Sequence, residues 1–134
     1  MRAMLAWALV AAAVSAWGGD APQGAPARPL VGAIRWDAWH GDASSAGQAV
    51  ERSLGPAHWH CRLPFFGEAV SPTEVRVRGD SQAVMDQEIA HAAAAGLDYW
   101  AFVAYEPDSA MSRGLALYLA NRHKADIRFC LLLQ

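Results

Sequence analysis

The segment from Met85 to Glu106 constrains the fold more than any other part of this sequence. It reads MDQEIAHAAAAGLDYWAFVAYE, an Ala-rich stretch with helical spacing, a glycine, and an apolar run that ends on a carboxylate. Gly96 predicts a helix stop, and the apolar run after it predicts a buried strand. This step is typical of parallel α/β proteins. It places Tyr105 and Glu106 at the carboxyl end of a strand, where such proteins hold their sites.

Two further apolar runs flank this step. Residues 30–37 and 127–133 predict the outer strands, so the order becomes strand–helix–strand–helix–strand. Apolar strands joined by helices predict a parallel sheet with right-handed crossovers. The long segment 41–79 carries Gly, Pro and Ser punctuation and is expected to be irregular, with one small exposed strand at 74–78.

Both helices have recognisable starts. Ser81 is a suitable N-cap for the first helix, and Asp108 or Ser109 can cap the second. Each helix also has an apolar stripe that is expected to face the core. The stripe residues are Met85, Ile89 and Ala92 in the first helix, and Met111, Leu115, Tyr118 and Leu119 in the second.

The first residues predict export. Arg2 and the apolar run 4–14 precede a small-residue cleavage pattern at 14–16, so residues 1–16 are interpreted as a signal peptide. An uncleaved anchor is the alternative, but the run is shorter than the ~20 residues of a membrane span. Residues 17–29 are a Pro/Ala/Gly linker. We therefore expect a secreted or periplasmic protein that is not held in a membrane after cleavage.

The charge of the chain argues against two classes of partner. The 134 residues carry a formal charge of −2 and have no Lys/Arg cluster, so neither a nucleic acid nor an anionic membrane surface is an expected partner. The only two cysteines are Cys61 and Cys130. An exported protein could join them in a disulfide, but Cys130 lies in an apolar run where a buried free thiol is the usual occupant.

Three blocks carry a family resemblance. They are VGAIRWDAWHG at 31–41, WHCRLPFF at 59–66, and the segment 85–102 with its AGLDYWAF ending. The chain resembles, over residues 30–134, the N-terminal part of secreted proteins related to glycoside hydrolase family 99 and the neighbouring WbsX-type carbohydrate-active proteins. Arg35 departs from the resemblance, because an aromatic residue is usual there.

The resemblance implies an α/β fold that is part of a (β/α)8 TIM barrel, with its first three parallel strands and two helices. It also implies a retaining-type glycoside hydrolase that acts on α-linked, mannose-like sugars or related polysaccharides. A whole barrel needs about 250 residues. The catalytic carboxylates of the family lie on later strands, so we expect this chain to be an inactive fragment with no catalytic residue and no cofactor.

Seven residues are predicted to contact a carbohydrate. An indole can cover the C–H face of a pyranose, while a carboxylate or an imidazole can hydrogen-bond its hydroxyl groups. The alternative for each is ordinary packing, turn capping or a solvated loop position. The residues follow the first strand, lie in the long segment, or follow the second strand: Asp37, Trp39 and His40; Trp59 and His60; Tyr105 and Glu106.

Two other function classes stay open. A non-catalytic carbohydrate-binding or interaction module would bind without turnover. A metal-dependent hydrolase could use His40, His58 and His60, or His58 and His60 could share zinc with Cys61, but the spacing fits a zinc site poorly and no metal is expected.

Overall fold

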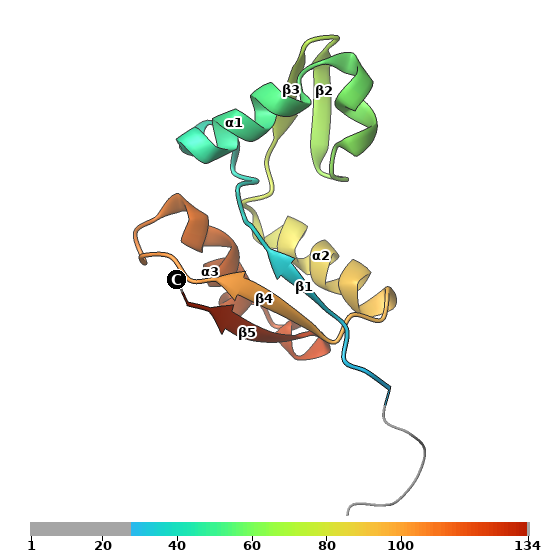
Figure 1. Ribbon diagram of the computed structural model, residues 1–134, viewed down its shortest axis with the longest axis vertical. Coiled ribbons are helices and arrows are strands. Elements are labelled where there is room, and N and C mark those ends of the chain that lie inside the picture. The colour runs from blue at the N-terminus through green and yellow to red at the C-terminus, as the bar shows by residue number, and fades with distance from the viewer. Residues whose placement is uncertain (1–27, 134) are drawn as a thin grey trace, which may run out of the picture.

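The computed structural model describes residues 28–133 and shows a mixed α/β fold. Three parallel strands form one sheet in the order β1 (Gly32–Arg35), β4 (Tyr99–Val103), β5 (Arg128–Leu132), as Figure 1 shows. The predicted parallel sheet is therefore confirmed. Within the described residues the sheet is open, with β1 and β5 at its edges.

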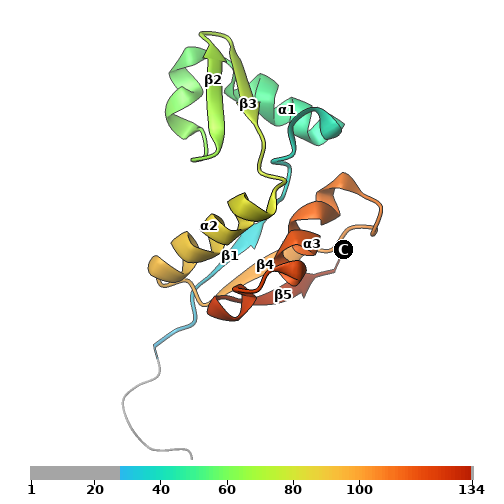
Figure 2. The same ribbon diagram turned by 180° about the vertical axis from the view of Figure 1, so that it is seen from behind.

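Both crossover helices cover the same face of the sheet, which Figure 2 views from the helix side. They are α2 (Gln82–Ala94) and α3 (Arg113–Ala120). The predicted N-cap of α2 is confirmed, because the Ser81 hydroxyl accepts the Val84 N–H at 3.3 Å. The predicted stop is confirmed as well, since Gly96 has φ +79°, a conformation that favours glycine.

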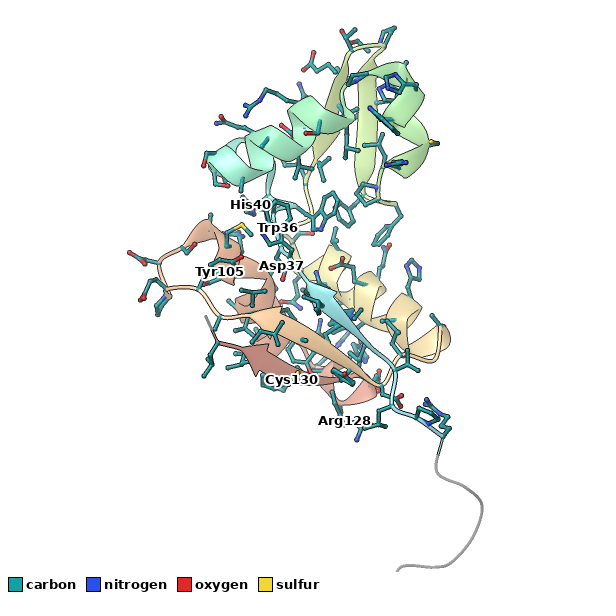
Figure 3. All side chains as sticks on the ribbon, viewed as in Figure 1. Trp36, Asp37, His40, Tyr105, Arg128 and Cys130 are labelled. Atoms are coloured by element: carbon teal, nitrogen blue, oxygen red, sulfur yellow. The ribbon has the colours of Figure 1, made fainter. Side chains whose placement is uncertain are left out.

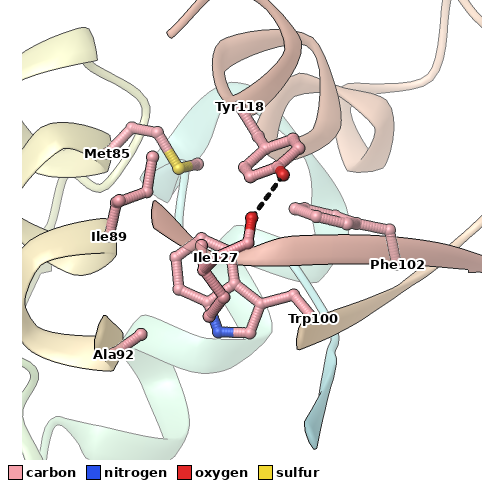
Figure 4. Packing of buried hydrophobic residues seen from close by; sticks show 7 residues of the cluster. All are labelled: Met85, Ile89, Ala92, Trp100, Phe102, Tyr118 and Ile127. Carbon is pink, nitrogen blue, oxygen red and sulfur yellow. Dashed lines mark hydrogen bonds between the residues drawn. The ribbon is translucent and has the colours of Figure 1, made fainter. Parts of the chain in front are cut away.

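The core lies between the two helices and the sheet. Figure 4 shows how its side chains interdigitate, and the Tyr118 hydroxyl donates a hydrogen bond to the Ile127 carbonyl at 2.6 Å. The predicted stripe of α2 is confirmed, but Leu119 of α3 is 45% exposed and was wrongly assigned to the core. Tyr118 takes the central position instead. The cluster consists of Met85, Ile89, Ala92, Trp100, Phe102, Tyr118 and Ile127.

Among the described residues, no helix lies over the opposite face of the sheet. Alternate β4 residues Trp100 and Phe102 point into the core, so Ala101 and its β5 neighbour Cys130 belong to the other face. Ile34 of β1 is 72% exposed there. The prediction of a buried Cys130 thiol is wrong for this reason. Cys61 and Cys130 are both exposed free thiols, and no disulfide joins them.

The segment 41–79 is not irregular, and its prediction is corrected. It forms a separate lobe from a helix, α1 (Ser45–Leu54), a 3-10 helix (Ala57–Arg62) and a hairpin of β2 (Gly67–Ser71) and β3 (Glu74–Val77). The predicted strand at 74–78 is confirmed as β3. It is not fully exposed, however, because Val75 and Val77 are buried.

The predicted signal peptide, residues 1–16, lies outside the described residues, as does most of the predicted linker, residues 17–29. Among the described residues, no helix has both the length and the apolar composition that a membrane span requires.

Candidate functional site

The candidate site lies where the chain leaves the sheet and enters the lobe. In Figure 3, Trp36, Asp37 and His40 gather at this junction, at the carboxyl end of β1. The two connections between lobe and sheet are held together here, because the Gly79 N–H donates to the Trp39 carbonyl at 2.6 Å. The strand-end placement predicted for Asp37, Trp39 and His40 is the one the structure has.

A buried ion cluster occupies the base of the junction. The Arg35 guanidinium donates to the Asp37 carboxylate at 2.6 and 2.9 Å and to the Glu88 carboxylate of α2 at 3.0 Å. The exposed fractions of these side chains are 11%, 10% and 19%. The guanidinium also lies over two aromatic rings, 4.4 Å from the centroid of Trp100 and 5.5 Å from that of Phe102. Arg35 thus joins β1, α2 and the core.

The cluster shifts two ionisation equilibria. Burial raises the pKa of Glu88 above that of an ordinary glutamate, and the nearby positive charge of Arg35 opposes this only in part. Burial alone would lower the pKa of Arg35, but Asp37 and Glu88 together raise it above its usual value. Arg35 therefore stays charged at every physiological pH, and Glu88 takes up a proton more readily than a solvated glutamate.

A cavity of about 530 Å³ opens above this cluster. Aromatic side chains form its wall, and the carboxylates of Asp37 and Glu88 form part of its lining. Trp36 and Phe65 are 53% and 50% exposed, so their ring faces are open to solvent. We call this cavity, with Trp36, Trp39, Phe65, Asp37 and Glu88, the aromatic cleft.

The lobe closes one side of the aromatic cleft. Phe65, from the loop before β2, contacts the His91 ring of α2 edge-on at 5.0 Å between centroids. Trp39 contacts Phe66 in the same way at 6.2 Å. Phe65 thus packs against α2, and Phe66 packs against the segment that follows β1. The cleft is therefore built from segments that lie far apart in the sequence.

A second cavity of about 570 Å³ lies beside the loop that follows β4. Tyr105 and His40 line it together with Pro107 and Leu115, so we call it the β4 cavity. Tyr105 therefore lies at a strand end as predicted, but it does not line the aromatic cleft. Glu106 is exposed and lines neither cavity. Its backbone carbonyl accepts the Ser112 hydroxyl at 2.7 Å.

Trp59 and His60 lie in the 3-10 helix of the lobe. The His60 ring bonds to the Gly55 carbonyl at 2.8 Å, and Arg62 stacks over Trp59 at 4.3 Å. Neither residue lines the aromatic cleft or the β4 cavity. The structure therefore does not bring them together with Asp37, and their predicted sugar contact stays a prediction. Within residues 28–133, no three His, Cys, Asp or Glu side chains are grouped as a metal site would need.

The sequence interpretation missed four residues of the cleft, Arg35, Trp36, Phe65 and Glu88. A signal for Glu88 was present, because it falls between Met85 and Ile89 on the buried stripe of α2. A carboxylate on an apolar stripe needs a cation as a buried partner. Arg35 was a candidate for that cation, because it lies in the predicted strand that precedes this helix. Phe65 carried no comparable signal.

Comparison with protein-family models, with curated proteins and with solved structures found no match to this chain. The resemblance to family-99-like proteins therefore stays a prediction from the sequence, and the function is argued from the geometry of the site.

Proposed function

We propose that this chain is carbohydrate-active and that the aromatic cleft binds a glycan. The observation that carries the proposal is the combination of open aromatic faces with a carboxylate pair in one cavity at the carboxyl end of a parallel strand. The proposal includes export, a (β/α)8 barrel of which β1, β4 and β5 are the first three strands, and α-linked, mannose-like sugars as ligands. Export rests on the pattern of residues 1–16, and the other parts rest on the sequence resemblance.

The chemistry of the cleft suits a pyranose ring. Trp36 offers an exposed indole face that can cover the C–H face of a sugar, and Trp39 and Phe65 extend the aromatic wall. The oxygens of Asp37 and Glu88 can accept hydrogen bonds from adjacent hydroxyl groups, while Arg35 fixes their positions. A volume of about 530 Å³ falls within the range of about 300–1,000 Å³ that is usual for ligand pockets.

Binding without hydrolysis is the activity proposed for the described residues. Glycoside hydrolysis requires two carboxyl groups roughly 5–10 Å apart, with one free to protonate the leaving group and the other free to act as nucleophile or base. Asp37 and Glu88 are close enough, because both bond to the same Arg35 nitrogen. Their bonds to that shared cation hold both carboxylates in place, so neither is free to move into these roles. Catalytic carboxylates would have to come from elsewhere.

The proposal is tested by titrating the folded chain with soluble α-mannan in affinity electrophoresis and calorimetry. We expect saturable binding that Trp36→Ala abolishes or weakens at least about tenfold, because the main stacking face is lost. Trp36 is exposed, so this change should leave the fold intact. Trp59→Ala is the matched control, since Trp59 lies outside both cavities.

A reducing-end assay on the same samples should detect no turnover. Equal binding by the Trp36→Ala and Trp59→Ala variants would remove the aromatic cleft as the binding site. If the unmodified chain binds neither α-mannan nor a panel of other neutral polysaccharides, the proposal itself fails.

A further inference from the structure

His40 and Ser44 form a polar pair outside the aromatic cleft that glycan binding does not use. The His40 ring is only 3% exposed, and its two nitrogens have different partners. Nδ1 lies 3.1 Å from the Asp37 carbonyl oxygen, and Nε2 lies 2.5 Å from the Ser44 hydroxyl oxygen. A carbonyl can only accept, so Nδ1 of the neutral ring carries the proton. Nε2 therefore accepts the Ser44 O–H.

This arrangement determines which way a proton can pass, from the Ser44 hydroxyl to His40. The backbone carbonyl orients the imidazole, and the imidazole presents its free electron pair to a hydroxyl group. It is the order in which a nucleophilic serine is activated by a histidine base, with a carbonyl in place of the usual orienting carboxylate. The position of Ser44 is also fixed by a helix, because Ser44 is the N-cap of α1.

Two glycines fix Ser44 in this position. Gly41 has φ +60°, and any side chain on Gly47 would meet the Gly41 carbonyl oxygen, which lies 1.9 Å from the place of the missing Cβ. This close approach brings the loop that carries His40 against the first turn of α1. The Gly47 N–H then donates to the Ser44 oxygen at 3.1 Å. The N–H groups of Ser45 and Ala46, in the same first turn, have no acceptor within the helix.

A cavity adjoins the pair. The β4 cavity, of about 570 Å³, is lined by His40 and its neighbour Ala43 on one side. Its other lining is mostly apolar, with Pro107, Leu115 and Leu119 among its members. Ser44 itself is half-buried, and the hydrogen bonds of its hydroxyl oxygen are only partly buried. Ser44 does not itself line the β4 cavity, but it follows Ala43 in the chain and its hydroxyl bonds to His40, so a small acyl group in the cavity would lie beside the pair.

We propose that Ser44 is a nucleophile for acyl transfer, with His40 as its general base and carboxylic esters of small acyl groups as substrates. The Ser44 oxygen bonds to the ester carbonyl carbon while its proton passes to His40 Nε2. The tetrahedral intermediate then breaks its bond to the alcohol, which leaves with that proton. Water repeats the two steps on the acyl-serine and releases the carboxylic acid. The free N–H groups of Ser45 and Ala46 are the donors that the chain offers next to Ser44 for the developing oxyanion.

The test uses the unmodified chain and a fluorophosphonate probe, with peptide mapping by mass spectrometry. We expect the probe to label Ser44 at least about a hundredfold faster than Ser81 and Ser109, because general-base activation contributes about 10²–10⁴ in rate. Ser81 and Ser109 are matched internal controls, since each caps a helix through its hydroxyl and neither hydroxyl bonds to a histidine. Equal labelling of the three serines would overturn the proposal, and so would no labelling.

Two variants separate chemistry from folding. His40→Gln should lower the labelling rate of Ser44 to that of Ser109, while Ser44→Ala should abolish the burst of p-nitrophenol from p-nitrophenyl acetate. Circular dichroism confirms that each variant is folded. If a folded His40→Gln protein labels as fast as the unmodified chain, His40 is not the base and the proposal is wrong. Glycan binding plays no part in these outcomes.

Discussion

Replacing Arg35 with methionine tests the energetic centre of the site. Methionine keeps much of the length and apolar stem of arginine but removes the charge that holds the carboxylates of Asp37 and Glu88. It also removes the cation above Trp100. The variant therefore leaves two poorly hydrated carboxylates near each other without a counterion, which is the costliest way to disrupt a buried ion cluster.

The expected loss is large for a chain of this size. Removing one partner of a buried ion pair costs about 3–5 kcal/mol in the free energy of unfolding. Exposed fractions of 10–19% mean that water still reaches the cluster, so we expect the lower part of that range. Domains unfold with about 5–15 kcal/mol in total. Arg35→Met should thus lower the urea midpoint strongly, as measured by tryptophan fluorescence.

The pH dependence identifies the cause of the loss. The pKa of Glu88 is raised in the folded chain, so its ionisation favours the unfolded state, and its contribution to stability falls as pH rises from the ordinary glutamate value through the folded value. Arg35→Met removes the positive charge that opposes this shift. The loss of stability in the variant should therefore grow as pH rises above the ordinary pKa of a glutamate, and it should shrink on acidification.

Arg128→Met is the matched control. Arg128 also lies on a strand of the sheet, but its side chain is 65% exposed and it reaches Asp98 only at 3.7 Å. We expect its unfolding free energy to change by less than about 0.5 kcal/mol. An Arg35→Met loss no larger than this, or one that does not change with pH, would refute the reasoning.

Three further predictions concern the fold that supports the site. Tyr118→Phe removes the donor to two backbone carbonyls and should cost about 1–3 kcal/mol, read as a lower Tm, with glycan affinity unchanged. Gly47→Ala should prevent folding of the lobe, seen as lost dispersion of its NMR amides, whereas Gly96→Ala meets open space and should cost only about 1 kcal/mol for its positive φ. The pKa of Asp98 is lowered, mainly by a backbone N–H and then by Arg28, so its contribution to stability should vanish as pH falls through that pKa. Asp98→Asn should flatten this acid limb of the stability curve.

The sheet and its helices were predictable because local signals agree there. Ser81 begins α2, Gly96 ends it, and the apolar period changes from helix to strand between them. The lobe was not predictable in the same way. The sequence of α1, SAGQAVERSL, does carry an apolar stripe at helical spacing, Ala46, Ala49, Val50 and Leu54, but the stripe is short and made largely of small residues, and it lies within a segment with Gly, Pro and Ser punctuation that was interpreted as irregular. It becomes a helix by packing against the hairpin that follows, which is a tertiary effect.

The candidate site was predictable in place but not in composition. The carboxyl ends of parallel strands meet at one edge of a sheet, so the position of Asp37 and Trp39 at that edge followed from the predicted strand. The ion cluster joins Arg35 to Glu88, which lies 53 positions later in the sequence. No local sequence pattern indicates that these two residues are close together in the fold. Trp59 and His60 were included because they lie in the long segment 41–79, which was interpreted as a loop that lines a sugar site. Their orientation depends on a 3-10 helix whose contacts lie within the lobe.

The most direct test of the central claim is an NMR titration of the ¹⁵N-labelled chain with an α-linked mannose oligosaccharide, observed at the indole N–H signals. Each tryptophan side chain gives a separate signal, so the location of binding is read without altering the protein. The proposal predicts that the signals of Trp36 and Trp39 shift together and saturate, while that of Trp59, which lies outside the aromatic cleft, stays in place. Shifts at Trp59 alone, or no shift at saturating sugar, would contradict it.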